Sequence, residues 1–319
     1  MNIVFLDAGT VVLDGDVELS GLEALGRFTP YDNTQLEDVV ERAADAEVII
    51  SNKVLISREA IEKLPKLKFI AVSATGYNNV DIVAARERGI GVSNVPGYST
   101  DSVAQQVFAA ILQHATHLAE YAADVERGEW EKSEIYTILR YRCFELRGKK
   151  LGIIGFGDIG QAVGELGLAF GMQVLPYRRG AIADARFQRA ELDTVIQESD
   201  FLSIHCPLTP DTKDLLNKDS LKRMKPSAFL INTARGGIVN EADLVEALKA
   251  GVIAGAAVDV LSAEPPRGNP LSAPGIPNLI LTPHTAWAAL EARQRLMLGV
   301  QSNIEAYARG EQSNIVNPA

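Results

Sequence analysis

Three glycines, Gly155, Gly157 and Gly160, have the spacing of a turn that receives the pyrophosphate of a dinucleotide. The apolar run 150–154 precedes the turn, and a helix-like stretch at 159–170 follows it. In that setting the first glycine permits a tight turn, the second lets a ligand approach the backbone, and the third allows close helix packing. N–H groups at the start of the helix would bind the phosphates. The surrounding elements therefore favour a dinucleotide site over a chance glycine pattern, and this site would include Asp158 and Ile159.

Reactive side chains also follow three apolar runs in the second half of the chain: Arg235, Glu264 and His284. In open α/β sheets the carboxyl ends of the strands form the ligand crevice. Hydride transfer to a ketone leaves charge on oxygen, so a proton donor that titrates near neutrality is needed, and histidine is the natural candidate. An acid bonded to the far nitrogen would hold the ring. An arginine can bind a substrate carboxylate through two hydrogen bonds.

The residues after the second predicted strand of the dinucleotide fold bear on the choice of cofactor. An acid at this place would bond the ribose 2′-hydroxyl of NAD(H), but the run 174–177 leads into Arg178 and Arg179. Because guanidinium groups suit a 2′-phosphate, the sequence favours NADP(H), with NAD(H) as the alternative. Two points oppose this preference: the arginines could form a solvated loop, and the Asp158 carboxylate would oppose further negative charge.

Short apolar runs alternate with helix-like stretches along the whole chain, which predicts parallel sheets covered by helices on both faces. We expect strands at residues 3–6, 48–51, 69–73, 151–154, 174–177, 201–205, 229–233, 256–260 and 279–281. Helical patterns occupy residues 35–44, 58–63, 82–88, 159–170 and 241–250, with longer ones at 100–127 and 287–309.

The glycine turn lies near the middle of the chain, although a dinucleotide fold normally opens with it. Residues before it should therefore form a separate domain, to which the helical pattern at 287–309 would return. The expected fold is α/β with two doubly wound parallel sheets. A Rossmann-type NAD(P)-binding domain would occupy residues 99–286. A flavodoxin-like substrate-binding domain would comprise residues 1–98 and 287–319.

The composition places limits on partners and location. With 319 residues, 47% hydrophobic and 23% charged, the chain has the balance of a globular protein of two domains. A net charge of -10 argues against a nucleic-acid surface. No apolar run is long enough to cross a bilayer, and the start MNIVFLDAGT lacks the pattern of a secretory signal. We expect a cytoplasmic protein without a metal, in which Cys143 and Cys206 are reduced thiols.

Motifs spread over nearly the whole chain agree with a single family. They are Ala74-Thr-Gly76-Tyr-Asn-Asn-Val-Asp81, Asn94-Val-Pro-Gly97, the Gly155 turn, His205-Cys-Pro-Leu-Thr209, Asn232-Thr-Ala-Arg-Gly-Gly237, Asp259, Glu264-Pro-Pro and Pro283-His284. Together these motifs resemble those of the D-2-hydroxyacid dehydrogenases. The resemblance implies that Arg235 anchors the substrate carboxylate, that His284 is the acid/base, and that Glu264 orients it.

The resemblance implies further site residues and a substrate class. Backbone N–H groups around Thr75 and Gly76 would bind the substrate carboxylate, and the protein would be a homodimer. Residues implied along the cofactor are His205, Pro207, Thr212, Thr233, Ala234 and Asp259. The blocks at 74–81, 97–104 and 285–287 are most similar to glycerate dehydrogenase and hydroxypyruvate or glyoxylate reductase members. This similarity implies NAD(P)H-dependent reduction of such a 2-keto acid to the D-2-hydroxy acid, and the reverse.

Some alternatives stay open. Between Trp130 and Gly148, where those relatives carry aromatic residues, this chain has Arg140 and Arg142, which could admit a larger or more anionic substrate or could simply be exposed. Exposure is slightly favoured. A dehydrogenase of the same fold could act on lactate, phosphoglycerate, phosphite or formate. A non-catalytic dinucleotide sensor or corepressor is the other alternative, but it would be expected to lack the arginine, the acid or the histidine.

Overall fold

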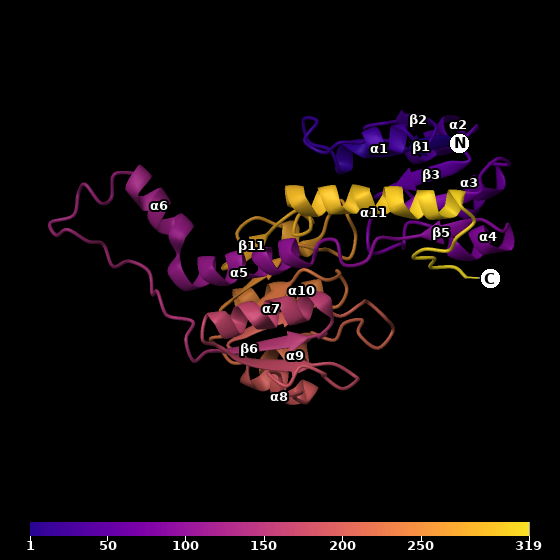
Figure 1. Cartoon of the computed structure of the whole chain (residues 1–319). Helices are drawn as coiled ribbons and strands as arrows, with labels where there is room; N and C mark the ends of the chain where they lie inside the picture. The colour runs from indigo at the N-terminus through magenta and orange to yellow at the C-terminus, as the bar shows by residue number, and fades with distance from the viewer. Residues whose placement is uncertain (319) are drawn as a thin grey trace. The chain divides into compact units, whose positions relative to one another are not determined.

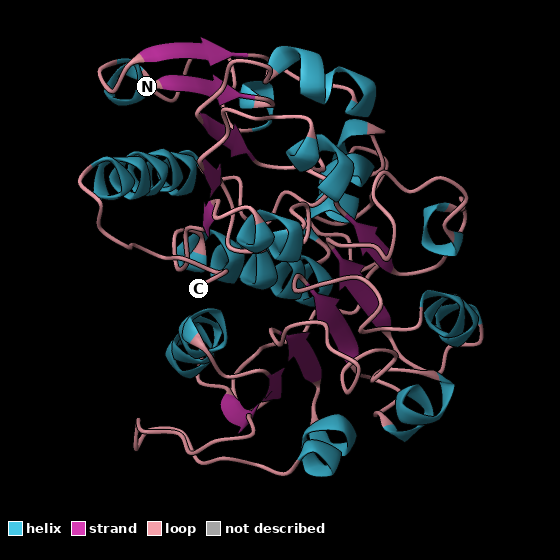
Figure 2. Cartoon of the chain, turned by 90° about the vertical axis from the view of Figure 1, so that its right-hand side faces the viewer, coloured by secondary structure: helices cyan, strands magenta, loops and turns pink. Residues whose placement is uncertain are grey.

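The computed structural model describes residues 1–318 and divides the chain into two compact units. Unit 1 comprises Met1–Ser99 and Trp287–Ala319, and unit 2 comprises Thr100–Ala286. Each unit has one parallel sheet with helices on both of its faces (Figures 1 and 2). The predicted fold class, two parallel-sheet α/β domains, is confirmed.

Unit 1 contains a five-stranded sheet in the order β2-β1-β3-β4-β5, which is the flavodoxin-like order. The strands are β1 (Asn2–Phe5), β2 (Arg27–Pro30), β3 (Val48–Ser51), β4 (Phe69–Val72) and β5 (Gly91–Ser93). The helices are α1 (Ser20–Glu23), α2 (Val39–Arg42), α3 (Arg58–Glu62), α4 (Ile82–Glu87) and α11 (Leu290–Ala308), with short 3-10 turns η1 (Ala8–Thr10) and η2 (Leu36–Asp38).

The sheet of unit 1 is covered on both faces, which explains its apolar central strands. All residues of β3 and β4 are buried, as expected for parallel strands between two helical layers. On one face, Ile49 and Ile70 belong to a core that includes Ile61 of α3. On the other face, the ring of Phe69 stacks on Tyr307 of α11, with 4.5 Å between the ring centroids. Helix α11 therefore completes the core of unit 1.

Unit 2 contains a six-stranded sheet in the order β11-β10-β9-β8-β6-β7. The strands are β6 (Lys150–Ile154), β7 (Gln173–Tyr177), β8 (Phe201–Ile204), β9 (Phe229–Asn232), β10 (Gly255–Val258) and β11 (Leu279–Leu281). The helices are α5 (Thr100–Thr116), α6 (Leu118–Glu126), α7 (Asp158–Ala169), α8 (Leu192–Glu198), α9 (Lys218–Arg223) and α10 (Glu241–Lys249), with the 3-10 turn η3 (Pro270–Ser272). The direction of winding reverses at β6, between β7 and β8, and such switch points are where doubly wound sheets bind ligands.

The structure differs from the sequence-based expectations in several places. Strands β2 and β5 were not predicted, because β2 has no fully buried residue and β5 has only three residues. The helical pattern at 35–44 is a 3-10 turn followed by the four-residue α2. The single helix expected over 100–127 is wrong: His117 has a left-handed backbone with φ of 52°, which separates α5 from α6.

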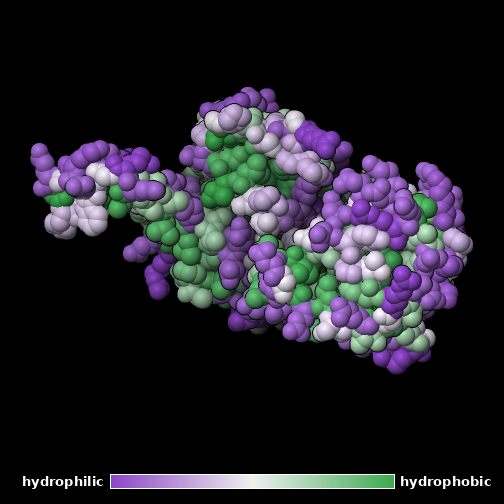
Figure 3. Space-filling model, turned by 90° about the horizontal axis from the view of Figure 1, so that it is seen from above, coloured by the Kyte–Doolittle hydropathy of each residue, from purple (hydrophilic) through white to green (hydrophobic). Residues whose placement is uncertain are grey.

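Helix α6 and the extended chain after it stand away from the sheet of unit 2 (Figures 1 and 3). We call residues 118–147 the arm. Within it the buried carboxylate of Asp124 pairs with Arg127 and, at 3.0 Å, with Arg140. Arg140 also pairs with Glu129 at 3.0 Å. The guanidinium of Arg140 therefore has a structural role in the arm, and its side chain is 44% exposed.

Candidate active site

Arg235, Glu264 and His284 follow three adjacent strands of unit 2 on the same edge of the sheet. Arg235 lies three residues after the end of β9, and His284 lies three residues after the end of β11. Glu264 lies in the loop that follows β10, the strand between them. Because all three strands are parallel, their carboxyl ends meet at one edge, so the chain brings these side chains to one region.

His284 and Glu264 form a hydrogen-bonded pair. The His284 Nδ1 atom lies 2.6 Å from Oε2 of Glu264, and Oε1 of Glu264 accepts a hydrogen bond of 2.7 Å from the Leu261 N–H. About a third of each side chain is exposed. A carboxylate at Nδ1 fixes the orientation of the ring, so any proton exchange with a substrate would have to use Nε2.

The backbone at His284 adopts the left-handed conformation, with φ of 55°, which non-glycine residues rarely use. Asp259, only 3% exposed, holds this conformation in place. Its carbonyl accepts from the His284 N–H at 2.8 Å. Its carboxylate accepts from the Thr282 hydroxyl at 2.5 Å, and from the Thr285 and Ala286 N–H groups at 3.0 and 2.9 Å. Asp259, expected along the cofactor, is thus also the residue that organises the His284 loop.

The turn that carries Arg235 is held by a side chain to which the sequence analysis gave no role. Buried Asn232, the last residue of β9, donates from Nδ2 to the Arg235 carbonyl at 2.9 Å. Its Oδ1 accepts from the Ala234 N–H at 3.1 Å. Arg235 itself is half-buried, and one of its Nη atoms donates to the Ala234 carbonyl. An asparagine at the end of an apolar strand is the signal that could have revealed this turn.

The glycine turn has the geometry that its spacing predicts. Gly155 has φ of 94°, and a Cβ there would lie 2.4 Å from the Cys206 nitrogen. A Cβ on Gly160 would lie 2.2 Å from the Gly155 carbonyl oxygen, whereas one on Gly157 would meet no atom within 4 Å. Two glycines are therefore required by the fold, and Gly157 leaves open space at the N-terminus of α7. This space fits a pyrophosphate that approaches the backbone.

Other residues predicted to lie along the cofactor are found at α7 and after β8 of unit 2. Asp158 and Ile159 open α7, and His205 and Pro207 follow β8. Burial lowers the pKa of His205 to about 3, so the ring is neutral, and it bonds the Ser203 hydroxyl at 2.8 Å. Thr212 folds the following loop back by donating to the Pro207 carbonyl at 2.7 Å.

Two further observations concern the cofactor. The hydroxyl of Thr233, between Asn232 and Ala234, is buried without a hydrogen-bond partner in residues 1–318, which leaves a polar atom for a ligand. Arg178 and Arg179 directly follow β7. Arg178 donates to the carbonyl of Phe156 in the glycine turn at 3.3 Å, whereas Arg179 pairs with Asp211 at 2.8 Å. Arg178 is therefore the guanidinium that lies at the turn.

In unit 1, Thr75 and Gly76 lie just beyond the end of β4. The Thr75 hydroxyl donates to the Val95 carbonyl at 3.0 Å, and the side chain of Asn94 donates to the Thr75 carbonyl at 2.7 Å. Within the described chain, the N–H groups of Thr75 and Gly76 donate no hydrogen bond. Two consecutive amide donors without an acceptor in the described chain therefore lie beyond β4.

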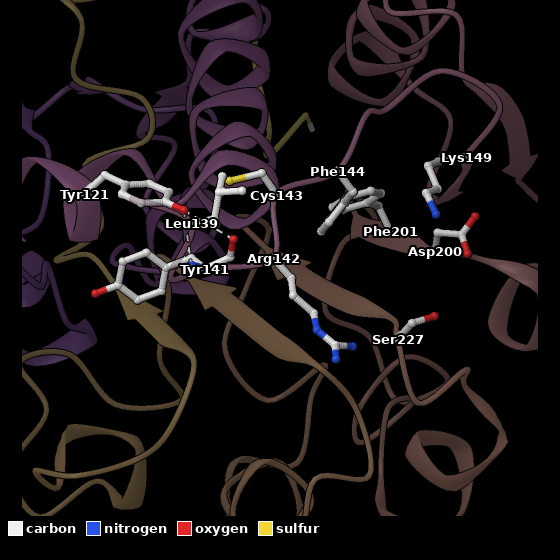
Figure 4. A pocket seen from close by; sticks show the side chains of 10 residues that line it. All are labelled: Tyr121, Leu139, Tyr141, Arg142, Cys143, Phe144, Lys149, Asp200, Phe201 and Ser227. Carbon is white, nitrogen blue, oxygen red and sulfur yellow. Dashed lines mark hydrogen bonds between the residues drawn. The ribbon is translucent and has the colours of Figure 1, made fainter. Parts of the chain in front are cut away.

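A further cavity lies elsewhere, at the base of the arm. Its volume is about 670 Å³, and Figure 4 shows its lining, which includes Leu139, Phe144, Lys149, Asp200 and Ser227. Lys149 and Asp200 directly precede β6 and β8, and Ser227 lies just before β9. This cavity is therefore at the amino ends of the strands. It is therefore at the opposite edge of the sheet from His284.

Among residues 1–318 no cluster of His, Cys, Asp or Glu is arranged to hold a metal ion, and no helix is long and apolar enough to cross a membrane.

Comparisons with known proteins identify the family. Residues 108–286 match the NAD-binding domain of the D-isomer specific 2-hydroxyacid dehydrogenases. The chain is 42% identical to a hydroxypyruvate reductase of Blautia hydrogenotrophica, over 99% of this chain and 100% of that protein. It is 39% identical to a glycerate dehydrogenase of Methylorubrum extorquens, over 99% and 98%. A solved acyclic imino acid reductase in complex with NADPH and D-Arg superimposes with a TM-score of 0.87 at 31% identity, over 99% and 100%.

The chain belongs to the D-isomer specific 2-hydroxyacid dehydrogenase family. It is a nicotinamide-dependent oxidoreductase that interconverts a 2-keto acid and a D-2-hydroxy acid. The predicted family, enzyme class and reaction are confirmed, and the non-catalytic sensor is set aside.

Proposed function

We propose that Arg235, Glu264 and His284 carry out this reaction. The 2.6 Å contact between His284 and Glu264, on the same sheet edge as Arg235, is the observation that supports this most directly. The nicotinamide, when bound, would supply the hydride that the keto carbon receives. Arg235 would bind the substrate carboxylate through two parallel hydrogen bonds from its guanidinium group. By the family resemblance, the Thr75 and Gly76 amides of unit 1 would be donors to a carboxylate. His284 would donate a proton from Nε2 to the keto oxygen as charge develops there, while Glu264 stabilises the charged ring.

Replacement of His284 tests this assignment. His284→Ala removes the proton donor but leaves the glycine turn, so kcat should fall by about 10²–10⁴-fold with cofactor affinity unchanged. Steady-state kinetics and a fluorescence titration with the reduced cofactor measure the two quantities. A variant that keeps near-normal kcat would show that another group donates the proton.

The proposed substrate is a small 2-keto acid of the hydroxypyruvate or glyoxylate type. Support comes from the names of the two relatives aligned over nearly their full lengths. A panel of hydroxypyruvate, glyoxylate, pyruvate and 3-phosphohydroxypyruvate, each with NADH and with NADPH, tests this by loss of nicotinamide absorbance. Hydroxypyruvate or glyoxylate should give the highest kcat/KM, and a higher value for pyruvate or for the phosphorylated acid would reassign the substrate.

We propose NADP(H) as the preferred cofactor, with Arg178 as the main contact to its 2′-phosphate. The position of Arg178 at the carbonyl of Phe156 supports this choice, and Arg179 is already paired with Asp211. Arg178→Ala should raise the KM for NADPH by about 10-fold or more, as expected for loss of a charge-assisted hydrogen bond, and should change the KM for NADH little. Arg189→Ala, at an exposed arginine further along the loop, is the matched control. Equal effects on both cofactors would contradict the proposal.

We propose that the protein is a homodimer formed through the arm. Leu139 is 88% exposed, Tyr136 is 91% exposed and Ile135 is 63% exposed, and apolar surface continues where the arm joins the rest of unit 2 (Figure 3). Exposed apolar side chains gathered on one projecting segment mark an interface, and a second copy offers the same cavity and arm in return. Leu139→Glu should convert the dimer to a monomer in analytical ultracentrifugation. Leu298→Glu, at an exposed leucine of α11, should not, and a wild-type monomer would refute the proposal.

We also propose a cytoplasmic location for the enzyme, which fits a site built for a nicotinamide cofactor. Cell fractionation followed by the 2-keto acid assay tests it, and activity in the membrane or secreted fraction would contradict it.

A further inference from the structure

Glu241, the first residue of α10, directs its carboxylate away from its own helix. The cap of that helix is Asn240, whose side chain accepts from the Asp243 N–H at 3.1 Å. Glu241 instead accepts three hydrogen bonds from residues 21 and 28 positions further along the chain. They come from the Ser262 N–H at 2.6 Å, the Ser262 hydroxyl at 2.7 Å and Nδ2 of Asn269 at 2.7 Å.

Ser262 and Asn269 bracket Glu264 in the loop between β10 and η3. All residues from Ser262 to Gly268 are exposed, so the loop has little apolar packing to fix it. Exposed segments of this kind open at low free-energy cost unless polar contacts hold them. The contacts to Glu241 tie both ends of the segment to a regular helix. The Glu264 carboxylate, which also accepts from the Leu261 N–H, lies between these two tied ends.

The Arg235 turn, which leads into α10, also contacts the loop that carries Glu264. A Cβ on Gly236 would lie 1.9 Å from the carbonyl carbon of Leu261 and 2.2 Å from the Ser262 nitrogen, so the two backbones are in direct contact. Residues 235–241 therefore meet the Glu264 loop twice, once at this glycine and once at the Glu241 carboxylate. This links the proposed substrate anchor to the support of the proposed proton donor.

We propose that Glu241 is a positioning residue, which holds the loop so that Glu264 stays against His284. The proposal rests on the roles proposed above for Glu264 and His284. Hydrogen bonds to a carboxylate are about twice as strong as those between neutral groups. Glu241→Gln would replace one of the two accepting carboxylate oxygens with an NH₂ group, which cannot accept a hydrogen bond. At least one of the three bonds would therefore be lost.

Glu241→Gln should lower kcat by about 10–100-fold, the usual cost of a small misplacement of reacting groups. The dissociation constant of the reduced cofactor should change less than about twofold, because the glycine turn is untouched. Glu246→Gln on the same helix is the matched control, since its exposed carboxylate has no hydrogen bond in the described chain, and it should behave as wild type. A kcat that falls only in proportion to the fraction of unfolded protein would overturn the proposal.

A double variant separates positioning through Glu264 from a general effect on stability. If Glu241 acts through Glu264, then Glu241→Gln combined with Glu264→Gln should be no slower than Glu264→Gln alone, within about twofold. Losses that multiply would overturn the proposal. If Glu241→Gln does not fold, Ser262→Ala, which removes one of the three bonds, takes its place in the same comparison.

The outcomes also distinguish this proposal from the one on which it rests. Wild-type kcat in Glu264→Gln would refute the role proposed for the His284 and Glu264 pair. A slow Glu264→Gln together with wild-type kcat in Glu241→Gln would refute only the positioning role of Glu241.

Discussion

Asp259→Asn tests how far the His284 loop depends on one buried carboxylate. Asparagine has the same shape, but one of its two polar atoms is an NH₂ group that cannot accept a hydrogen bond. If the amide oxygen stays with Thr282 and Thr285, the Ala286 N–H, 2.9 Å from the carboxylate, loses its acceptor and faces another donor. A buried donor left without an acceptor costs about 1–3 kcal/mol, and loss of charge from the remaining bonds adds about 1 kcal/mol.

The free energy of unfolding should therefore fall by about 2–4 kcal/mol, and for a unit of this size Tm should fall by about 4–16 °C. Turnover should fall by about 10-fold or more, because the backbone that carries His284 is loosened. Thermal unfolding followed by circular dichroism, with kcat measured well below Tm, gives both values. Asp219→Asn, at an exposed carboxylate on α9, is the control and should change stability by less than about 0.5 kcal/mol. A variant with wild-type Tm and kcat would refute the reasoning.

Four further perturbations probe the site and the fold. Gly157→Ala should keep wild-type Tm but weaken cofactor binding by at least about 10-fold, because its Cβ enters the open space before α7. Gly155→Ala should instead lower stability by about 3 kcal/mol or more, because φ of 94° and the Cys206 backbone exclude a side chain, and equal Tm values for the two variants would contradict this. Asn232→Ala should raise the KM for the 2-keto acid by about 10-fold, with the KM for cofactor little changed, because the Arg235 turn loses two hydrogen bonds; unchanged kinetics would refute that role. Burial lowers the pKa of His114 from 6.5 to about 4. As the pH decreases through this range, the unfolded chain binds a proton before the folded chain does, so the free energy of unfolding decreases. His114→Phe, which keeps the stack on Phe229 at 4.2 Å, should lose less Tm than wild type between pH 6.5 and 4, and parallel Tm curves would contradict it.

Much of the fold follows from local sequence patterns. Strands such as β3 and β9 are runs of apolar residues buried on both faces, so their positions were predicted to within one residue. The break at His117 was not, because a helical pattern continues on either side and only the backbone angle at one residue ends the helix. Strand β2 has half-exposed residues at the edge of the sheet, where no apolar run is required.

The candidate site was predictable for a related reason. Arg235 and His284 each lie three residues beyond an apolar strand, so parallel pairing alone places them at one edge. The support of that site was not predictable, because it depends on hydrogen bonds between distant residues. Glu241 reads as an ordinary acid in the first turn of a helix, and its bonds to Ser262 and Asn269 depend on how two loops meet. Asp259 was assigned to the cofactor, and its hold on the His284 loop follows from the register of β10 and β11.

The order of the two units along the chain has a consequence for biosynthesis. Unit 2 is continuous, whereas unit 1 needs α11, which is made more than two hundred residues after β4, the strand whose Phe69 it covers. Until Leu296, Val300 and Ile304 leave the ribosome, one face of the nascent unit 1 sheet, including Phe69, has no helix to cover it. Domains generally fold as units during synthesis, so unit 2 can fold first while the earlier strands wait. The exposed face of those strands is then the part of the chain to which chaperones would bind first, and through which nascent chains would first aggregate.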